Sequence, residues 1–226
     1  MKLLYLFILL CTMSLTAQTH TESLVNVTGK GIIKVVPDQV AIKVRVESEG
    51  KDAMGVKNEN NASINAVIKF LRSEGLKDED VQTEYINLNK NYDYNTKTYS
   101  YKANQSLTVL LKDIKQYETI ISGLLNSGIN RIDGVQFKSS KAASLRSEAR
   151  VKAILDAKQR AETYATAIGQ SIGRAVQISE ASANVPRPQL RSANFAMESS
   201  SGGGETIAPG ELSIVVTISA SFELKL

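Results

Sequence analysis

Alanine recurs at every fourth position in residues 142–168, at Ala149, Ala153, Ala157, Ala161 and Ala165. Side chains four residues apart lie on one side of an α-helix, and small side chains let the helix lie close to its neighbour. Each step of four residues overshoots a full turn by about 40°, so the five alanines sweep about 160° around the helix. One flat sheet cannot contact all of this alanine stripe. We therefore expect part of the stripe to meet a second partner, either another lobe of the chain or another subunit.

Alternation of apolar and polar residues marks the strands of this chain. In residues 40–46 every second residue is valine or isoleucine, and the residues between them are alanine, lysine and arginine. This period of two predicts a strand with one buried face and one wet face. Strands are expected over residues 24–36, 40–46, 81–94, 99–111, 129–137, 175–179 and 214–224.

The first expected strand contains two glycines and is followed by a turn. Gly29 and Gly31 indicate a bulge or a place where another backbone approaches closely. Pro37 and Asp38 are typical of a turn, so we expect the chain to reverse between the first two strands.

Apolar spacings of three and four predict amphipathic helices over residues 51–72 and 114–126. Gly75 and Gly128 follow these segments and are suited to ending a helix. The order of strands and helices predicts an α+β fold, with antiparallel sheets covered by helices. We expect two α/β lobes, one of them containing the long alanine-rich helix.

Tyrosines gather near the tip of the hairpin that residues 81–111 are expected to form. The alternation predicts that Tyr94 lies opposite Tyr99 and that Tyr92 lies opposite Tyr101, all on the face that carries Ile86. Such an aromatic patch is a candidate interaction surface. The alternative is that the rings cover the edge of a core or a helix.

The N-terminus has the layout of a signal peptide. Met1 and Lys2 precede an apolar run at residues 3–10, and small and polar residues follow at 14–17. The run is shorter than the roughly 20 apolar residues that a membrane-spanning helix needs. We expect cleavage after Ala17, with no integral membrane span in the mature chain. The only cysteine, Cys11, would be removed with the signal, so no disulfide is expected.

Residues 183–210 contain three prolines, a serine run and three consecutive glycines, a composition that predicts a flexible loop. An alternating strand follows this loop at the end of the chain. A chain that closes with a core strand is not a domain with a loose tail. We therefore expect residues 18–226 to form a single domain.

The residues of the mature chain offer little for catalysis. The sole histidine, His20, lies beside the expected cleavage site, where a catalytic triad would need an unusual arrangement. Asp78, Glu79 and Asp80 lack the spacing of a calcium loop and are typical of a solvated turn. The usual zinc ligands are missing, and the basic residues are scattered among acids instead of forming a patch for nucleic acid. We predict no catalytic residue, no cofactor and no metal.

Short segments spread over the chain carry a resemblance to a known family. They are Val27-Thr28-Gly29-Lys30-Gly31, Val36-Pro37-Asp38, Gly75-Leu76, Asp80-Val81-Gln82-Thr83, Ala165-Thr166-Ala167-Ile168-Gly169 and Pro209-Gly210-Glu211. Together with the tyrosine-rich hairpin, they resemble the SIMPL-domain family. This family includes periplasmic immunogenic proteins and a periplasmic protein associated with oxidative-stress defence. The resemblance implies periplasmic residence and, as in some members, ring-like oligomers. It implies no active site.

The expected function is that of an exported periplasmic or envelope protein that is not an enzyme. It would form a homo-oligomer, contact an envelope component and contribute to envelope or oxidative stress tolerance. One alternative is a monomeric module that binds a ligand or polymer through the tyrosines and the loop. Another is a hydrolase that uses carboxylates in a cleft between the lobes, which requires a buried carboxyl pair with strongly shifted pKa values.

Overall fold

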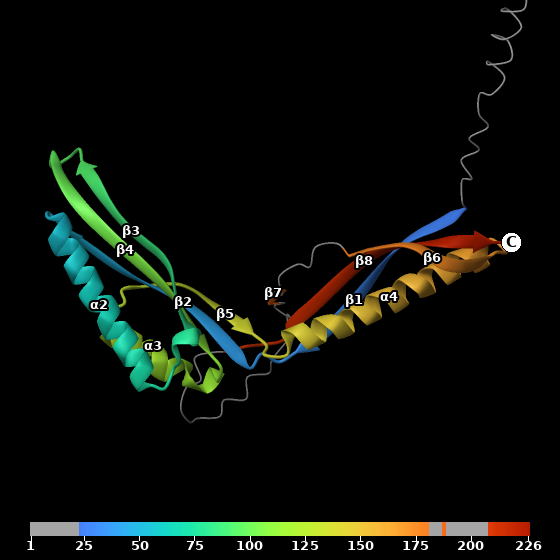
Figure 1. Cartoon of the computed structure of the whole chain (residues 1–226), viewed down its shortest axis with the longest axis horizontal. Coiled ribbons are helices and arrows are strands. Elements are labelled where there is room, and N and C mark those ends of the chain that lie inside the picture. The colour runs from blue at the N-terminus through green and yellow to red at the C-terminus, as the bar shows by residue number, and fades with distance from the viewer. Residues whose placement is uncertain (1–22, 181–186, 189–207) are drawn as a thin grey trace, which may run out of the picture.

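The protein is built from two lobes, one an antiparallel sheet with a single long helix against one face and the other an antiparallel sheet with two helices (Figure 1). The computed structural model describes residues 23–180, 187–188 and 208–226. The predicted α+β class and the division into two lobes are confirmed. The predicted signal peptide at residues 1–17 lies outside the described residues, as do residues 183–186 and 189–207 of the predicted flexible loop.

The terminal lobe combines the two ends of the described chain. Its elements are β1 (Leu24–Val35), α4 (Ala142–Ala167), β6 (Ser171–Glu180), β7 (Arg187–Pro188) and β8 (Leu212–Lys225). The strand order is β1-β8-β6, and the short β7 pairs with Leu212 and Ser213 of β8. The first and last long strands are therefore neighbours, so the terminal lobe can fold only after both β1 and β8 have been synthesised.

The central lobe is inserted between β1 and α4. Its elements are β2 (Gln39–Gly50), α2 (Ala53–Ser73), β3 (Val81–Asp93), β4 (Thr98–Leu111), α3 (Tyr117–Asn126) and β5 (Arg131–Lys138), with short 3₁₀ turns at Asp78–Asp80 and Ile114–Gln116. The strand order is β3-β4-β2-β5. Strand β3 pairs only with β4, so it forms one edge of the sheet as described.

The core of the central lobe follows from the alternation of β2. The valines and isoleucine at 40, 42, 44 and 46 are at most 2% exposed and face the buried side of α2. Asp52 caps this helix by accepting a hydrogen bond from the backbone N–H of Gly55 at 2.6 Å. Asn60 is the one polar residue among the buried positions of α2, and its amide donates to the carbonyl of Val46 at 3.0 Å.

The alanine stripe lies entirely inside the terminal lobe. All five alanines are 0% exposed, and α4 packs against β1, β8 and β6 of its own lobe. The expectation that part of the stripe needs a second partner is therefore corrected. A sheet is not flat: its strands twist, and three of them together follow the small side chains as these turn around the helix.

Two glycines of β1 make this close approach possible. A β-carbon on Gly29 would lie 2.0 Å from the carbonyl oxygen of Ala153, and one on Gly31 would lie 1.9 Å from that of Ala149. No heavy atoms of separate residues can approach so closely, so only glycine fits at either position while α4 stays in place. The expectation of a close backbone approach at these glycines is confirmed.

Gly31→Ala should lower the free energy of unfolding by about 2 kcal/mol or more, because the new methyl group must displace the backbone of α4. Gly134→Ala is the matched control. It lies in β5, and no atom lies within 4 Å of the position that its new methyl group would take, so the change should stay within about 0.5 kcal/mol. Urea unfolding followed by circular dichroism measures both. Equal stability of the two variants would contradict the close packing of α4 on β1.

The two connections between the lobes are joined by Asp38. Its carboxylate accepts hydrogen bonds from the backbone N–H of Ser140, at 2.7 Å, and from the Ser140 hydroxyl. Its own backbone N–H donates to the carbonyl of Lys138 at 3.2 Å. The hydrogen bonds from the Ser140 hydroxyl and backbone hold the pKa of Asp38 below its usual value. Residues 36–38 and 139–141 are thus fastened together where the chain passes between lobes.

Asp38→Asn should lower the free energy of unfolding by about 1 kcal/mol at pH 7, since an exposed, charged acceptor is lost. The pKa of Asp38 is lower in the folded chain than in the unfolded chain. Its contribution is therefore complete above the unfolded pKa of about 4 and is lost as the pH falls through the folded pKa. Urea unfolding of both proteins across this range measures the difference.

The control for this prediction is Ser140→Ala, which removes the hydroxyl donor. In that background Asp38→Asn should cost less, because the two residues share one interaction. A difference between Asp and Asn that persists unchanged at low pH would contradict the assignment.

Candidate functional sites

The turn of the tyrosine hairpin is set by Asp93. Its carboxylate accepts hydrogen bonds from the backbone N–H groups of Asn95, at 2.8 Å, and Thr96, at 3.3 Å. Lys97 closes the turn with a φ of 54°. Because the side chain of Asp93 starts the turn, the strand ends one residue earlier than predicted.

This turn changes which tyrosines are opposite each other. Tyr92 pairs with Tyr99, and Lys90 pairs with Tyr101. The predicted pairs, Tyr94 with Tyr99 and Tyr92 with Tyr101, are wrong because the register is displaced by two residues. A displacement of two residues is a full period of a strand, so the faces are unchanged. Tyr94 lies in the turn itself.

The rings nevertheless form one cluster. The ring centres of Tyr92 and Tyr94 are 5.0 Å apart with the planes at 88°, and those of Tyr92 and Tyr99 are 4.9 Å apart. The ammonium group of Lys90 lies 4.0 Å from the ring centre of Tyr99 and 5.9 Å from that of Tyr101. We call these four tyrosines and Lys90 the tyrosine patch. Its geometry is that of edge-to-face and cation–π contacts.

The tyrosine patch is exposed at the end of the central lobe that is remote from the terminal lobe (Figure 1). Tyr94 is 84% exposed and Tyr99 is 55% exposed. Strand β2 ends where Gly50 pairs with Tyr101, so the tip of the hairpin extends past it. Among the described residues, no third strand supports the hairpin tip.

Strand β3 continues this exposed surface along the edge of the sheet. Ile86 is 72% exposed and Leu88 is 44% exposed, on the same face as the patch. Helix α2 packs over β2 and β4 more than over β3, which leaves these side chains uncovered. An edge strand with exposed apolar residues is a template for pairing with another chain.

Of the predicted interaction residues, the structure brings Tyr92, Tyr94, Tyr99 and Tyr101 together on the surface and buries the five alanines. Sequence reasoning did not include Lys90 in the patch. Lys90 lies two residues before Tyr92 and therefore on the same face of the strand. This spacing could have identified it from the sequence.

The acidic cluster at residues 78–80 is neutralised by neighbouring cations. The ammonium group of Lys112 lies 2.8 Å from a carboxylate oxygen of Asp80 and 3.0 Å from one of Glu79. These two acids raise the pKa of Lys112. The guanidinium group of Arg72 donates to Asp78 at 2.9 Å. The cluster thus forms the ion-paired turn between α2 and β3.

The pKa shifts of the carboxyl groups run in the direction opposite to that of a general acid. Among the described residues, each carboxyl group with a displaced pKa has it lowered, through hydrogen bonds to a cation, hydroxyl or backbone N–H. They are Asp38, Glu49, Glu84, Asp93, Asp156 and Glu180. General acid catalysis by a carboxyl group near neutral pH needs a raised pKa. Within residues 23–180, 187–188 and 208–226, no three side chains of the metal-ligating types are grouped to hold a metal ion.

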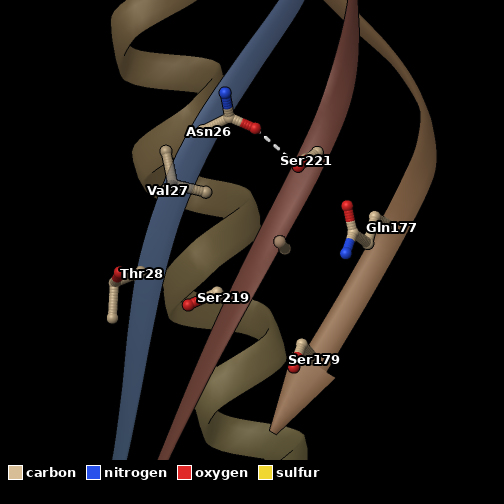
Figure 2. Close-up of a pocket in the computed structure, with 8 residues that line it drawn as sticks. Asn26, Val27, Thr28, Gln177, Ser179, Ser219 and Ser221 are labelled. Carbon is tan, nitrogen blue, oxygen red and sulfur yellow. Dashed lines mark hydrogen bonds between the residues drawn. The ribbon is translucent and has the colours of Figure 1, made fainter. Parts of the chain in front are cut away.

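A shallow hollow of about 220 Å³ lies on the terminal sheet, on the face turned away from α4 (Figure 2). Neutral polar side chains from β1, β8 and β6 line it, and the hydroxyl of Ser221 lies 2.5 Å from the amide oxygen of Asn26. Its lining includes Thr28, Gln177 and Ser219 but no titratable group. The hollow therefore offers hydrogen bonds without an acid or a base.

The fold and these surfaces define a two-lobed α+β protein with a buried alanine-rich helix and an exposed aromatic hairpin. Residues 25–222 match the family model SIMPL, described as a protein of unknown function (DUF541). The match covers nearly the whole described chain, so the protein belongs to the SIMPL family.

Curated relatives match over most of the chain. The 26 kDa periplasmic immunogenic protein of Brucella melitensis is 29% identical over 217 residues, which cover 92% of this chain and 87% of that protein. The uncharacterized protein YggE of Escherichia coli K12 is 23% identical, over 72% of this chain and 68% of its own length. Among the helices of the described residues, none has the length and apolar character needed to span a membrane.

Proposed function

We propose that this chain is exported to the periplasm or cell envelope and acts there by assembling with copies of itself, not by catalysis. The name of the Brucella relatives and the expected signal peptide at residues 1–17 support the location. The ion-paired carboxylates support a non-catalytic role. Family resemblance supports a contribution to envelope or oxidative stress tolerance. With its only cysteine at position 11, the exported chain would not act as a thiol peroxidase.

The observation that carries self-assembly is the exposed edge of β3 and its tyrosine tip. Four large side chains of this strand are more than a third exposed, namely Tyr85, Ile86, Leu88 and Tyr92. Natural proteins usually protect such an edge with charges, prolines or a covering element. A second copy would both pair with the free backbone groups of β3 and cover its apolar side chains.

The association free energy requires the tyrosine patch in addition to the apolar side chains of β3. Full burial of an exposed leucine or isoleucine contributes about 1.5–3 kcal/mol, whereas association costs about 4–15 kcal/mol in lost freedom of motion. Ile86 and Leu88 together contribute at most about 3–6 kcal/mol, which reaches only the lower part of that cost. The tyrosine patch adds aromatic area at the same edge, and Tyr and Trp are prominent among residues that dominate interfaces.

Replacing both Tyr94 and Tyr99 by serine should reduce the assembled mass of the chain from Gln18 onward, since the two most exposed rings of the patch are removed. We expect the dissociation constant to rise by roughly 100-fold, the equivalent of about 2.7 kcal/mol. Light scattering after size exclusion, over a dilution series, measures this change. Both rings are surface side chains, so the melting temperature of the dissociated chain, measured at high dilution, should change little.

The matched control is Tyr164→Ser, which removes a tyrosine that is 55% exposed on α4, in the other lobe. It should assemble like the parent chain. If the doubly substituted hairpin keeps the parent mass, the patch is not the interface. If the parent chain is monomeric at every concentration and is retained on an envelope polymer through these tyrosines, the chain is a monomeric binding module instead.

A further inference from the structure

A cavity of about 330 Å³ lies where the two lobes meet, and no part of the proposed assembly uses it. It is placed where β5 ends, α4 begins and β8 starts, near the middle of the molecule in Figure 1. Its volume falls at the small end of the roughly 300–1,000 Å³ that is typical of ligand sites. Boundaries between structural units are a common position for such sites.

The lining combines an apolar wall with positive charge. Phe137, Ala142, Leu212 and Ile214 supply apolar surface from both lobes. The remaining residues are Gln39, Gln136, Lys138, Ser139 and Arg146. Two cations and no acid are therefore among the residues that line one small, partly apolar space.

The two cations have no close anionic partner among the described residues. Glu180, the acid whose pKa is influenced by Arg146, is held by Arg150, whose guanidinium group donates to it at 2.8 Å. Glu84, which Lys138 influences, is ion-paired with Lys43. Each of these two acids is thus already paired with another cation, and the nearby carboxylate of Asp38 is held by the hydroxyl and backbone N–H of Ser140. No ion pair among the described residues occupies Arg146, and Lys138 is an exposed residue that also lines a neighbouring hollow with Glu84.

Arg146 is suited to bind the charged end of that ligand. It is half-buried, in the second turn of α4, and its planar guanidinium group can donate two parallel hydrogen bonds to a carboxylate. The apolar wall of Leu212 and Ile214 offers a surface for a hydrocarbon body. A neutral or cationic molecule would leave the positive charge uncompensated in this partly apolar site.

We propose that the cavity between the lobes binds a small organic anion, a carboxylate attached to a short apolar body. The carboxylate would contact Arg146 and Lys138, and the apolar body would lie against Leu212 and Ile214. Because the cavity is formed by residues from both lobes, the bound anion would also fix the lobes relative to each other. The site is distant from the tyrosine patch and does not depend on self-assembly.

Octanoate, octan-1-ol and octylammonium, titrated into the chain from Gln18 onward and followed by calorimetry, test the proposal. Octanoate should bind with one equivalent per chain, and the other two should bind at least roughly tenfold more weakly, the equivalent of about 1.4 kcal/mol. Equal binding of octylammonium, or no binding of octanoate, would overturn the proposal.

Two variants locate the site. Arg146→Gln should weaken octanoate binding by roughly tenfold or more, whereas Lys152→Gln, which removes an exposed charge from the same helix outside the cavity, should leave it unchanged. Ala142→Met fills the cavity without changing its charge and should also abolish binding. Octanoate that binds Arg146→Gln and Ala142→Met as tightly as the parent chain occupies another site, and this result would also overturn the proposal.

Discussion

The close packing of α4 on β1 is the contact on which the rest of the structure depends. At Gly29 and Gly31 a helix backbone lies where any other residue would place its β-carbon, and small alanines face the strand along the whole helix. This packing brings the helix onto a sheet formed by the first and last long strands. Every element of the central lobe lies between β1 and α4 in the sequence. The central lobe is therefore an insertion into the terminal lobe.

The insertion determines where the exposed surfaces lie. The central lobe is attached through two short connections, which Asp38 fastens together at their base. Its sheet extends away from that base and ends in the β3–β4 hairpin (Figure 1). The cavity that contains Arg146 lies at the base, and the tyrosine patch lies at the far end. A ligand in the cavity would therefore contact both lobes at their junction. The tyrosine patch, at the far end, is placed to contact a second molecule.

The sequence predicted the elements well because most of them obey a simple period. Alternation along β2 and β8 identified their buried faces, and the order of elements indicated two antiparallel lobes. The predicted pairing within the tyrosine hairpin was wrong because the true register is set by a hydrogen bond from the turn backbone to the side chain of Asp93. The prediction of a second partner for the alanine stripe was also wrong. It assumed a flat sheet, whereas the sheet that packs against α4 is twisted.

The cavity between the lobes was beyond prediction from the sequence. Its lining joins Gln39 and Arg146 with Leu212, residues far apart in the chain that have no shared pattern. Only the arrangement of the two lobes brings them together. The tyrosine patch, in contrast, belongs to one local hairpin, which is why its four tyrosines could be chosen before the fold was known.

Hydrogen exchange of β3 at concentrations above and below the assembly transition tests the central claim most directly. An edge strand that pairs with a second copy gains backbone hydrogen bonds, so its outward amides should exchange more slowly when the chain is concentrated. The account predicts this protection in β3, with the interior strand β8 unchanged. Exchange in β3 that is the same at every concentration, or protection gained only elsewhere, would contradict assembly through the tyrosine hairpin.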